Sequence, residues 1–307
     1  MLIHLITSLC VIFPAVREAT ADTLGIPVSD AVINTILSTD SLSPVGRATL
    51  SWDWRRLDTN VIWDFAPDGK IQEYRSSKDV ELAFDGDKIR FEARYRKPNP
   101  RGGKIDIWET QAFDGDKLEV FVVWTEDRTG ETKSEGAIYD SYYLNTDTFD
   151  PRVRGLMNRT TVSEFLRGKL KPWLLTGVDD LGAAFIDSLE CREFGALVAA
   201  NGDSVYAALA PSWSWRPRRM TLVSREVRQV TDYRFSRVEG FWLPVRIDIE
   251  TDRIDPANGH VTPYTVEKLI YEYSGIAHSP QDSVFTGIFP PQVTPEDRRR
   301  GNQPTDK

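Results

Sequence analysis

Alternation of apolar and polar residues is the feature that most constrains how this chain can fold. Ile89, Phe91 and Ala93 alternate with charged residues, and Tyr95 continues the series. Because successive side chains of a strand point to opposite faces, this period of two predicts a strand with one buried face. Further strands are predicted at 47–55, 118–124, 219–225, 232–238, 241–250 and 264–273.

A local repeat indicates how neighbouring strands are joined. The order Ala-Phe-Asp-Gly-Asp-Lys occurs at 83–88 and again at 112–117, each time between two alternating runs. Asn201-Gly202 occupies a similar place further along the chain. Asp, Asn and Gly tolerate the positive φ angles of tight hairpin turns, so these segments predict antiparallel hairpins.

Helical spacing of apolar residues appears in only a few places. The first is a short segment after Pro27, and two more are predicted at 150–169 and 178–188, where Leu181, Ala184 and Phe185 form a stripe. The sequence therefore predicts an antiparallel sheet with segregated helices, the α+β class, with a helical insert near 150–188.

The first residues have the character of an export signal. Residues 2–16 are mostly apolar, and Ala19-Thr20-Ala21 offers a cleavage site with small residues. We expect residues 1–21 to be a signal peptide, 22–290 a single domain, and 291–307, rich in proline and charge, a flexible tail. After cleavage Cys191 is the only cysteine, so no intrachain disulfide is expected.

No catalytic constellation is visible in the sequence. The chain has 3 histidines, and it lacks the spacings of zinc sites, nucleophile elbows, phosphate loops and dinucleotide-binding glycines. We therefore predict no catalytic residue, no metal and no cofactor. The net charge of -8 argues against a nucleic acid as the main partner.

The 9 tryptophans are more informative. Trp52, Trp63 and Trp124 lie on the apolar phase of predicted strands, which suits either a core or the wall of a cavity. Trp213 and Trp215 lie between prolines, in a predicted loop beside the arginines 216, 218 and 219. That loop is interpreted as either a solvated basic segment or a place for an acidic headgroup.

A family resemblance adds to this pattern. An opening helix, strands joined by Asp-Gly turns, the segment 241–245 (Phe-Trp-Leu-Pro-Val) before a long strand, and 282–291 (Asp-Ser-Val-Phe-Thr-Gly-Ile-Phe-Pro-Pro) resemble the exported LolA-like outer-membrane lipoprotein-sorting proteins. Within that superfamily the chain is most similar to a planctomycete-type branch, although it is longer than the carrier proper.

The resemblance implies a strongly curved antiparallel sheet, an incomplete β-barrel, with helices covering its concave face. It also implies a periplasmic, non-enzymatic carrier of lipid or lipoprotein acyl chains, with a further envelope protein as a second kind of partner. The expected cavity wall consists of Trp52, Trp54, Trp63, Phe91, Tyr95, Val122 and Trp124.

Two other functions remain open from the sequence. The tryptophans and the 46 acidic residues also suit an envelope carbohydrate-binding protein or a glycoside-acting enzyme. The same fold would also suit an envelope sensor that acts through a protein partner.

Overall fold

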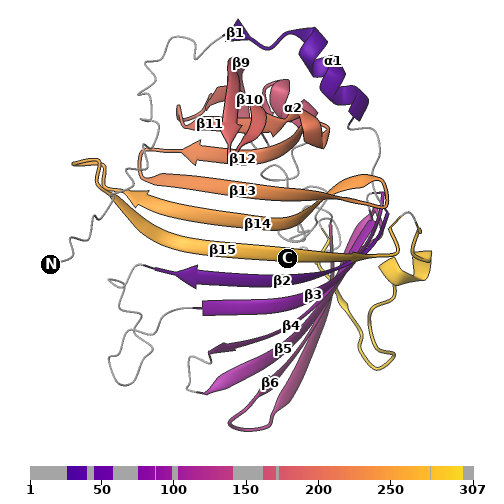
Figure 1. Cartoon of the computed structure of the whole chain (residues 1–307). Coiled ribbons are helices and arrows are strands. Elements are labelled where there is room, and N and C mark those ends of the chain that lie inside the picture. Colours follow the sequence, from indigo (N-terminus) through magenta and orange to yellow (C-terminus); the bar gives the residue numbers. More distant parts are fainter. Residues whose placement is uncertain are drawn as a thin grey trace, which may run out of the picture.

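The computed structural model describes residues 26–39, 45–57, 75–86, 88–98, 103–140, 162–170, 173–276 and 278–299. The predicted signal peptide and Trp63 lie outside these residues. Within them almost all regular structure is strand, and Figure 1 shows the strands as one large, strongly bent sheet. The N-terminal strands are β1 (Ile26–Pro27), β2 (Gly46–Arg56), β3 (Arg75–Asp85), β4 (Lys88–Pro98), β5 (Lys104–Phe113), β6 (Lys117–Glu126) and β7 (Thr132–Asp140).

The second half of the chain continues the sheet. Its strands are β8 (Lys169–Leu170), β9 (Trp173–Ile186), β10 (Leu189–Val198), β11 (Ser204–Ala210), β12 (Arg216–Val223), β13 (Val227–Val238), β14 (Phe241–Ile254), β15 (Val261–Ser274) and β16 (Glu296–Asp297). In space the order is β1-β9-β10-β11-β12-β13-β14-β15-β2-β3-β4-β5-β6-β7-β16, with β8 paired to β9. The central pairing of β15 with β2 joins the two halves of the sequence.

The predicted hairpin turns are confirmed. Gly86 and Gly115, with φ of 53° and 103°, join β3 to β4 and β5 to β6, and both pairs are antiparallel. The Asp114 carboxylate accepts the backbone N–H groups of Asp116 and Lys117 at 2.9 and 3.0 Å. Gly202, with φ of 75°, joins β10 to β11 in the same way. Local turn chemistry therefore sets the register of these three pairs.

The core lies on one face of this sheet. One cluster of buried side chains includes Leu50 of β2, Phe91 of β4, Phe194 of β10 and Leu269 of β15. Ile36 of α1 (Asp30–Thr39) also belongs to it, as do Phe165 and Leu166 of α2 (Val162–Leu166). Strands far apart in the sheet thus contribute to a single cluster, so we call the face that bears it the inner face.

The expected α+β architecture is wrong in its helical part. In the described residues α1 has 10 residues and α2 has 5, the 3-10 helices η4 (Pro211–Trp213) and η5 (Asp282–Phe285) are shorter still, and the remaining regular structure is the open sheet. Helices α1 and α2 contribute a few side chains to the core near β9 to β12 (Figure 1). They are too small to cover the concave face of a sheet of this extent.

The helix predicted at 178–188 is also wrong, because this segment belongs to β9 and its hairpin with β10. Gly177 and Gly182 adopt φ of 154° and 96°, and a register shift lies beside Gly182. Asp187 and Ser188 then form the turn with φ of 49° and 67°. Long-range pairing with β10 outweighs the helical spacing of the apolar residues. Of the predicted helix at 150–169, only Val162–Leu166 is helical among the described residues.

The C-terminal segment packs on the outer face of the sheet. Phe285 is buried, Phe289 lies edge-on to Phe121 of β6, and β16 pairs in parallel with β7. The buried Glu119 carboxylate accepts the backbone N–H groups of Gly287 and Ile288 at 2.8 and 3.3 Å. The part of the expected tail up to residue 299 is therefore joined to the sheet.

Among the described residues, no helix has both the length and the hydrophobicity that crossing a membrane requires.

Candidate functional site

The candidate site lies on the inner face, at one end of strands β2 to β6. Strand register places one residue from each strand side by side in the order Trp52, Lys78, Tyr95, Ile107 and Trp124. We call these five residues the aromatic row. Ile107 is buried, whereas the other four are half-buried. Three large aromatic rings thus line a sheet face without being fully packed into the core.

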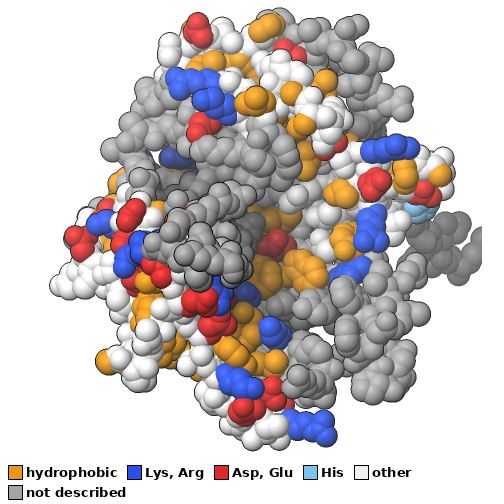
Figure 2. All heavy atoms as spheres, turned by 180° about the vertical axis from the view of Figure 1, so that it is seen from behind, with side chains coloured by type: hydrophobic (Ala, Val, Ile, Leu, Met, Phe, Trp, Pro, Cys, Tyr) orange, Lys and Arg blue, Asp and Glu red, His pale blue; other side chains and the backbone are white. Residues whose placement is uncertain are grey.

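The next residues along the same strands form a parallel row of different character. Leu50, Val80 and Ala93 are buried in the core, whereas Glu109 and Val122 on β5 and β6 are half-buried. The inner face therefore changes from apolar to mixed between β4 and β5. Figure 2, from the opposite side of the molecule, shows hydrophobic side chains next to acidic and basic ones around a central hollow.

Polar contacts tie the aromatic row together. The Tyr95 hydroxyl donates to Glu109 Oε2 at 3.2 Å, and Gln111 Nε2 donates to Glu109 Oε1 at 2.6 Å. At the other end of the row, Trp52 Nε1 donates to Glu267 Oε1 of β15 at 2.6 Å. These bonds hold the hydroxyl of Tyr95 and the indole of Trp52 against carboxylates of neighbouring strands.

Lys78 lies between the two rings. Its Nζ is 3.9 Å from the centroid of the Tyr95 ring and 5.6 Å from that of Trp52, within the range of cation–π attraction. Burial lowers the pKa of this amine, the Glu109 carboxylate opposes that effect, and Lys97 adds to it. Burial, aided by Glu109, raises the pKa of Tyr95, so its hydroxyl stays protonated as a donor. The row therefore combines apolar surface with a small polar centre.

The structure separates the predicted wall residues into groups. Trp52, Tyr95 and Trp124 lie in the aromatic row, with Trp54 and Val122 half-buried on the same face beside them. Phe91 is 2% exposed and belongs to the core. The wall predicted from the sequence does not include the polar residues that lie beside the row or are linked to it by hydrogen bonds, which are Lys78, Glu109, Gln111 and Glu267. Their sequence signal is a polar residue on the apolar phase of a strand, as in Lys78 before Val80, Leu82 and Phe84.

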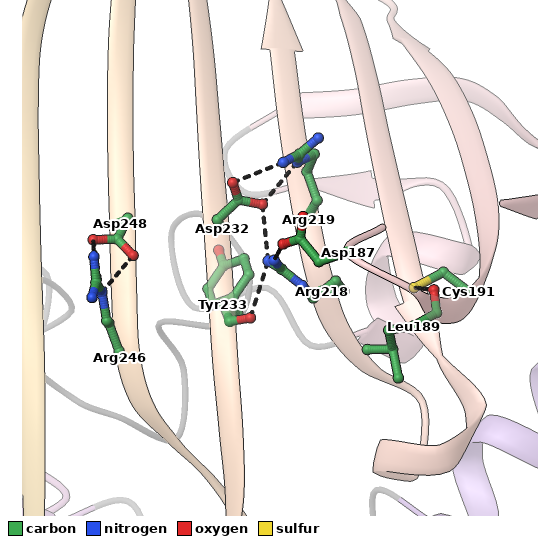
Figure 3. Close-up of polar contacts among 9 residues, drawn as sticks. All are labelled: Asp187, Leu189, Cys191, Arg218, Arg219, Asp232, Tyr233, Arg246 and Asp248. Atoms are coloured by element: carbon green, nitrogen blue, oxygen red, sulfur yellow. Dashed lines mark hydrogen bonds and ion pairs between the residues drawn. The ribbon is translucent and has the colours of Figure 1, made fainter. Parts of the chain in front are cut away.

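The arginines beside Trp213 and Trp215 do not form a basic loop. Arg216 to Arg219 begin β12, and the Arg218 side chain is 7% exposed. Figure 3 shows Arg218 pointing to Asp187, Asp232 and the carbonyl of Tyr233, with Arg219 on the same Asp232. These carboxylates satisfy the two guanidinium groups within the protein. This arrangement is a structural ion-pair network and does not support the interpretation of a headgroup site.

Cys191 lies near this network, on β10 (Figure 3). Its thiol is buried, its Sγ donates to the Leu189 carbonyl at 3.6 Å, and burial raises its pKa. A buried thiol with a raised pKa is a poor nucleophile. Among the described residues, no group of three or more His, Cys, Asp or Glu side chains could hold a metal ion.

A second hollow lies on the outer face, over β15, β2, β3 and β4. Its volume is about 490 Å³, and its polar lining includes Thr49, Ser51, Asp79, Glu81, Glu92, Arg94 and Glu272. Trp108 on the neighbouring β5 is 40% exposed, and its Nε1 donates to Glu92 Oε1 at 2.9 Å. Acidic side chains outnumber basic ones in the lining of this outer hollow, which also includes Ile270, in contrast to the aromatic row on the inner face.

Comparison with known proteins gives only distant similarities. No family model and no curated protein matches the chain. A DUF1329 family protein from Desulfovibrio piger is similar to 80% of this chain over 92% of its own length, with 10% identity and a TM-score of 0.38. A putative outer membrane lipoprotein-sorting protein domain from Vibrio parahaemolyticus is similar to 83% of this chain over 94% of its own, with 6% identity and a TM-score of 0.39.

Proposed function

We propose that this chain is an exported, non-enzymatic carrier or binding protein for a lipid-like ligand. The apolar part of the ligand lies along the aromatic row, against Trp52, Tyr95 and Trp124. The observation that carries the proposal is that these three rings occupy neighbouring register positions on the inner face and remain half-buried.

Burial energetics support an apolar ligand at this place. Removing apolar surface from water contributes roughly 25 cal/mol per Å², and aromatic rings offer large areas. Binding sites for small molecules combine mostly apolar walls with a few polar groups that fix orientation. Lys78, Glu109 and Glu267 are the polar groups next to the rings, so the polar end of the ligand is expected beside them.

The wider proposal concerns the form and place of the mature protein. Residues 22–290 form a single domain that is exported to the periplasm after removal of residues 1–21. Its partners are the acyl chain of a lipid or lipoprotein and a further envelope protein. Cell fractionation and N-terminal sequencing of the mature chain test this part, since a retained N-terminus in the cytosolic fraction would exclude it.

Ligand content tests the carrier function directly. Native mass spectrometry of protein purified from its source without denaturation is expected to show bound acyl material, and the delipidated protein is expected to take up a fluorescent fatty acid. Trp124→Ala should reduce uptake at least tenfold, whereas Thr110→Val, on the opposite face, serves as the matched control. Absence of acyl material together with absence of uptake would remove this function.

Carbohydrate binding at the outer hollow is the second candidate. Exposed Trp108 beside Glu92 and the hydroxyl groups of Thr49 and Ser51 offers the stacking surface and hydrogen-bonding groups that a sugar needs. Retention on a polysaccharide column that is lost in Trp108→Ala would support it, and turnover of glycosides would extend it to an enzyme. A protein that is neither retained nor active would leave the inner face as the site.

A further inference from the structure

Gln111 is a buried amide that lies opposite Phe91 in the strand register and is linked to Tyr95 of the aromatic row through Glu109, and one half of its hydrogen bonding is unmet. It lies on the inner face of β5, two residues from Glu109, and is 6% exposed. Its Nε2 donates to Glu109 Oε1 at 2.6 Å, whereas its buried Oε1 has no partner among the described residues. The reverse orientation of the amide would place its oxygen against a carboxylate oxygen of Glu109. The amide nitrogen must therefore face Glu109, and the atom without a partner is the amide oxygen, Oε1.

Two of the donors near the row, the Tyr95 hydroxyl and the Trp52 indole, are engaged with carboxylates of the protein. The Tyr95 hydroxyl donates a hydrogen bond to Glu109, and the Trp52 indole N–H donates one to Glu267. Glu109 accepts two hydrogen bonds and has no proton to offer as a carboxylate. Glu109, Glu267 and Gln111 thus place several acceptors beside the row, together with the Lys78 ammonium, whose Nζ lies 3.9 Å from the centroid of the Tyr95 ring. A buried acceptor without a donor is costly, and a group that supplies a donor there is favoured.

We infer that the polar end of the ligand presents a hydroxyl or amide N–H that donates to Gln111 Oε1. This inference rests on the proposed function and specifies its ligand as an acylated molecule with a donor-bearing neutral head, such as a monoacylglycerol. A head that is only a carboxylate would meet Glu109 and leave Gln111 Oε1 without a partner. A head that is an alkyl ester would supply no donor at all.

The test compares two probes with the same acyl chain. Each of 1-monododecanoylglycerol and methyl dodecanoate displaces a bound fluorescent acyl probe from the full-length mature protein. The wild-type protein is expected to bind the glycerol derivative about fivefold more tightly, the effect of one satisfied hydrogen bond. Gln111→Met keeps the length of the side chain without the acceptor and should bring the ratio close to one. Thr110→Val, on the same strand but the opposite face, should keep the wild-type ratio.

Each result decides a different point. Equal affinity of the two probes for the wild-type protein overturns the inference and leaves the carrier function standing, with a water molecule as the donor to Gln111. A preference that persists unchanged in Gln111→Met also overturns the inference. If neither probe displaces anything, the carrier function fails and the inference falls with it. The wild-type ratio needs no variant, so it remains decisive if Gln111→Met does not fold.

Discussion

The two ends of the inner face of β2 to β6 have the same alternating pattern but different surroundings. At the core end, Phe84, Phe91 and Phe113 are at most 5% exposed, and the C-terminal segment packs on the outer face of the same strands. At the aromatic end, Trp52 and Tyr95 remain half-buried and are held by hydrogen bonds to Glu267 and Glu109.

This difference separates two uses of large aromatic residues. A ring that is enclosed on all sides stabilises the fold, whereas a ring that keeps part of its surface available is suited to a ligand. The alternation of residues is the same in both cases, so packing around the strand decides the role. A substitution at the core end should therefore mainly lower the stability of the fold. A substitution at the matched position of the aromatic end should mainly weaken ligand binding.

The largest expected effect comes from paired substitutions on β4. Phe91 and Tyr95 lie on the same face of this strand, one in the core and one in the aromatic row. Phe91→Ala leaves a cavity and should lower the free energy of unfolding by about 3–5 kcal/mol in urea denaturation. Tyr95→Ala should cost about 1 kcal/mol yet weaken acyl binding at least tenfold. Equal losses of stability would show that the two ends do not differ.

Loss of the Glu119 carboxylate should release the C-terminal segment from the core end. Glu119→Ala leaves the N–H groups of Gly287 and Ile288 and the Lys117 amine without their acceptor. The expected loss is about 2–3 kcal/mol, with faster proteolysis near residue 287. Glu131→Ala, at an exposed turn between β6 and β7, is the control and should change neither measurement. Unchanged proteolysis of the Glu119 variant would contradict the role of this contact.

Lowering the pH should show a difference in the contribution to stability between Asp114 at the core end and Asp106 at the aromatic end. Burial raises the pKa of Asp114, but the backbone N–H groups of Lys117 and Asp116 outweigh it, so the net pKa is lowered. A hydrogen bond from Arg96 lowers the pKa of the exposed Asp106. Both carboxylates therefore stabilise the fold at a pH above their ordinary pKa of 3.8. This contribution is lost as the pH falls through their lower pKa values in the folded protein.

Asp114→Ala should lower the free energy of unfolding by about 1 kcal/mol at pH 7, with the difference from wild type shrinking toward pH 2. Asp106→Ala should show a smaller difference, because exposed ion pairs contribute little. Urea denaturation at several pH values measures both. A larger effect for Asp106 would reverse the proposed ranking of the two ends.

The smallest expected effect on stability concerns Lys78 in the aromatic row. Because its pKa is lowered in the folded protein, the unfolded chain binds more protons as the pH approaches 10.5, and stability should rise with pH in that range. Lys78→Met should remove this rise while leaving stability at pH 7 almost unchanged. Lys133→Met, at an exposed position on β7, should keep it. A wild-type protein whose stability falls between pH 8 and pH 10 relative to Lys78→Met would contradict the argument.

Local signals in the sequence were sufficient for β2, β4, β6 and β12 to β15 and for three hairpin turns. Asp-Gly at 85–86 and 114–115 fixes two hairpins, and the alternation at 89–95 identifies the buried face of β4. The segment 178–188 was misleading because its apolar spacing suits a helix, whereas pairing with β10 is a long-range contact that spacing does not record. The C-terminal segment raised the same difficulty, since Glu119 is distant in sequence from Gly287.

The candidate site was predictable only in its aromatic part. Trp52, Tyr95 and Trp124 follow the apolar phase, but the phase alone does not distinguish them from Phe91 in the core. The polar members Lys78, Glu109 and Gln111 break the apolar phase at neighbouring register positions. Such breaks become informative only when the register between strands is known.

Tryptophan quenching by a bromine-labelled monoacylglycerol tests the central claim, that the aromatic row holds the ligand, most directly. Quenching should occur in the wild-type protein and decrease in both Trp52→Phe and Trp124→Phe. It should persist in Trp213→Phe, because Trp213 packs against Phe235 and Trp242, with ring centroids 5.8 and 6.3 Å away, outside the aromatic row. Absence of quenching, or quenching that is lost only in Trp213→Phe, would contradict the account.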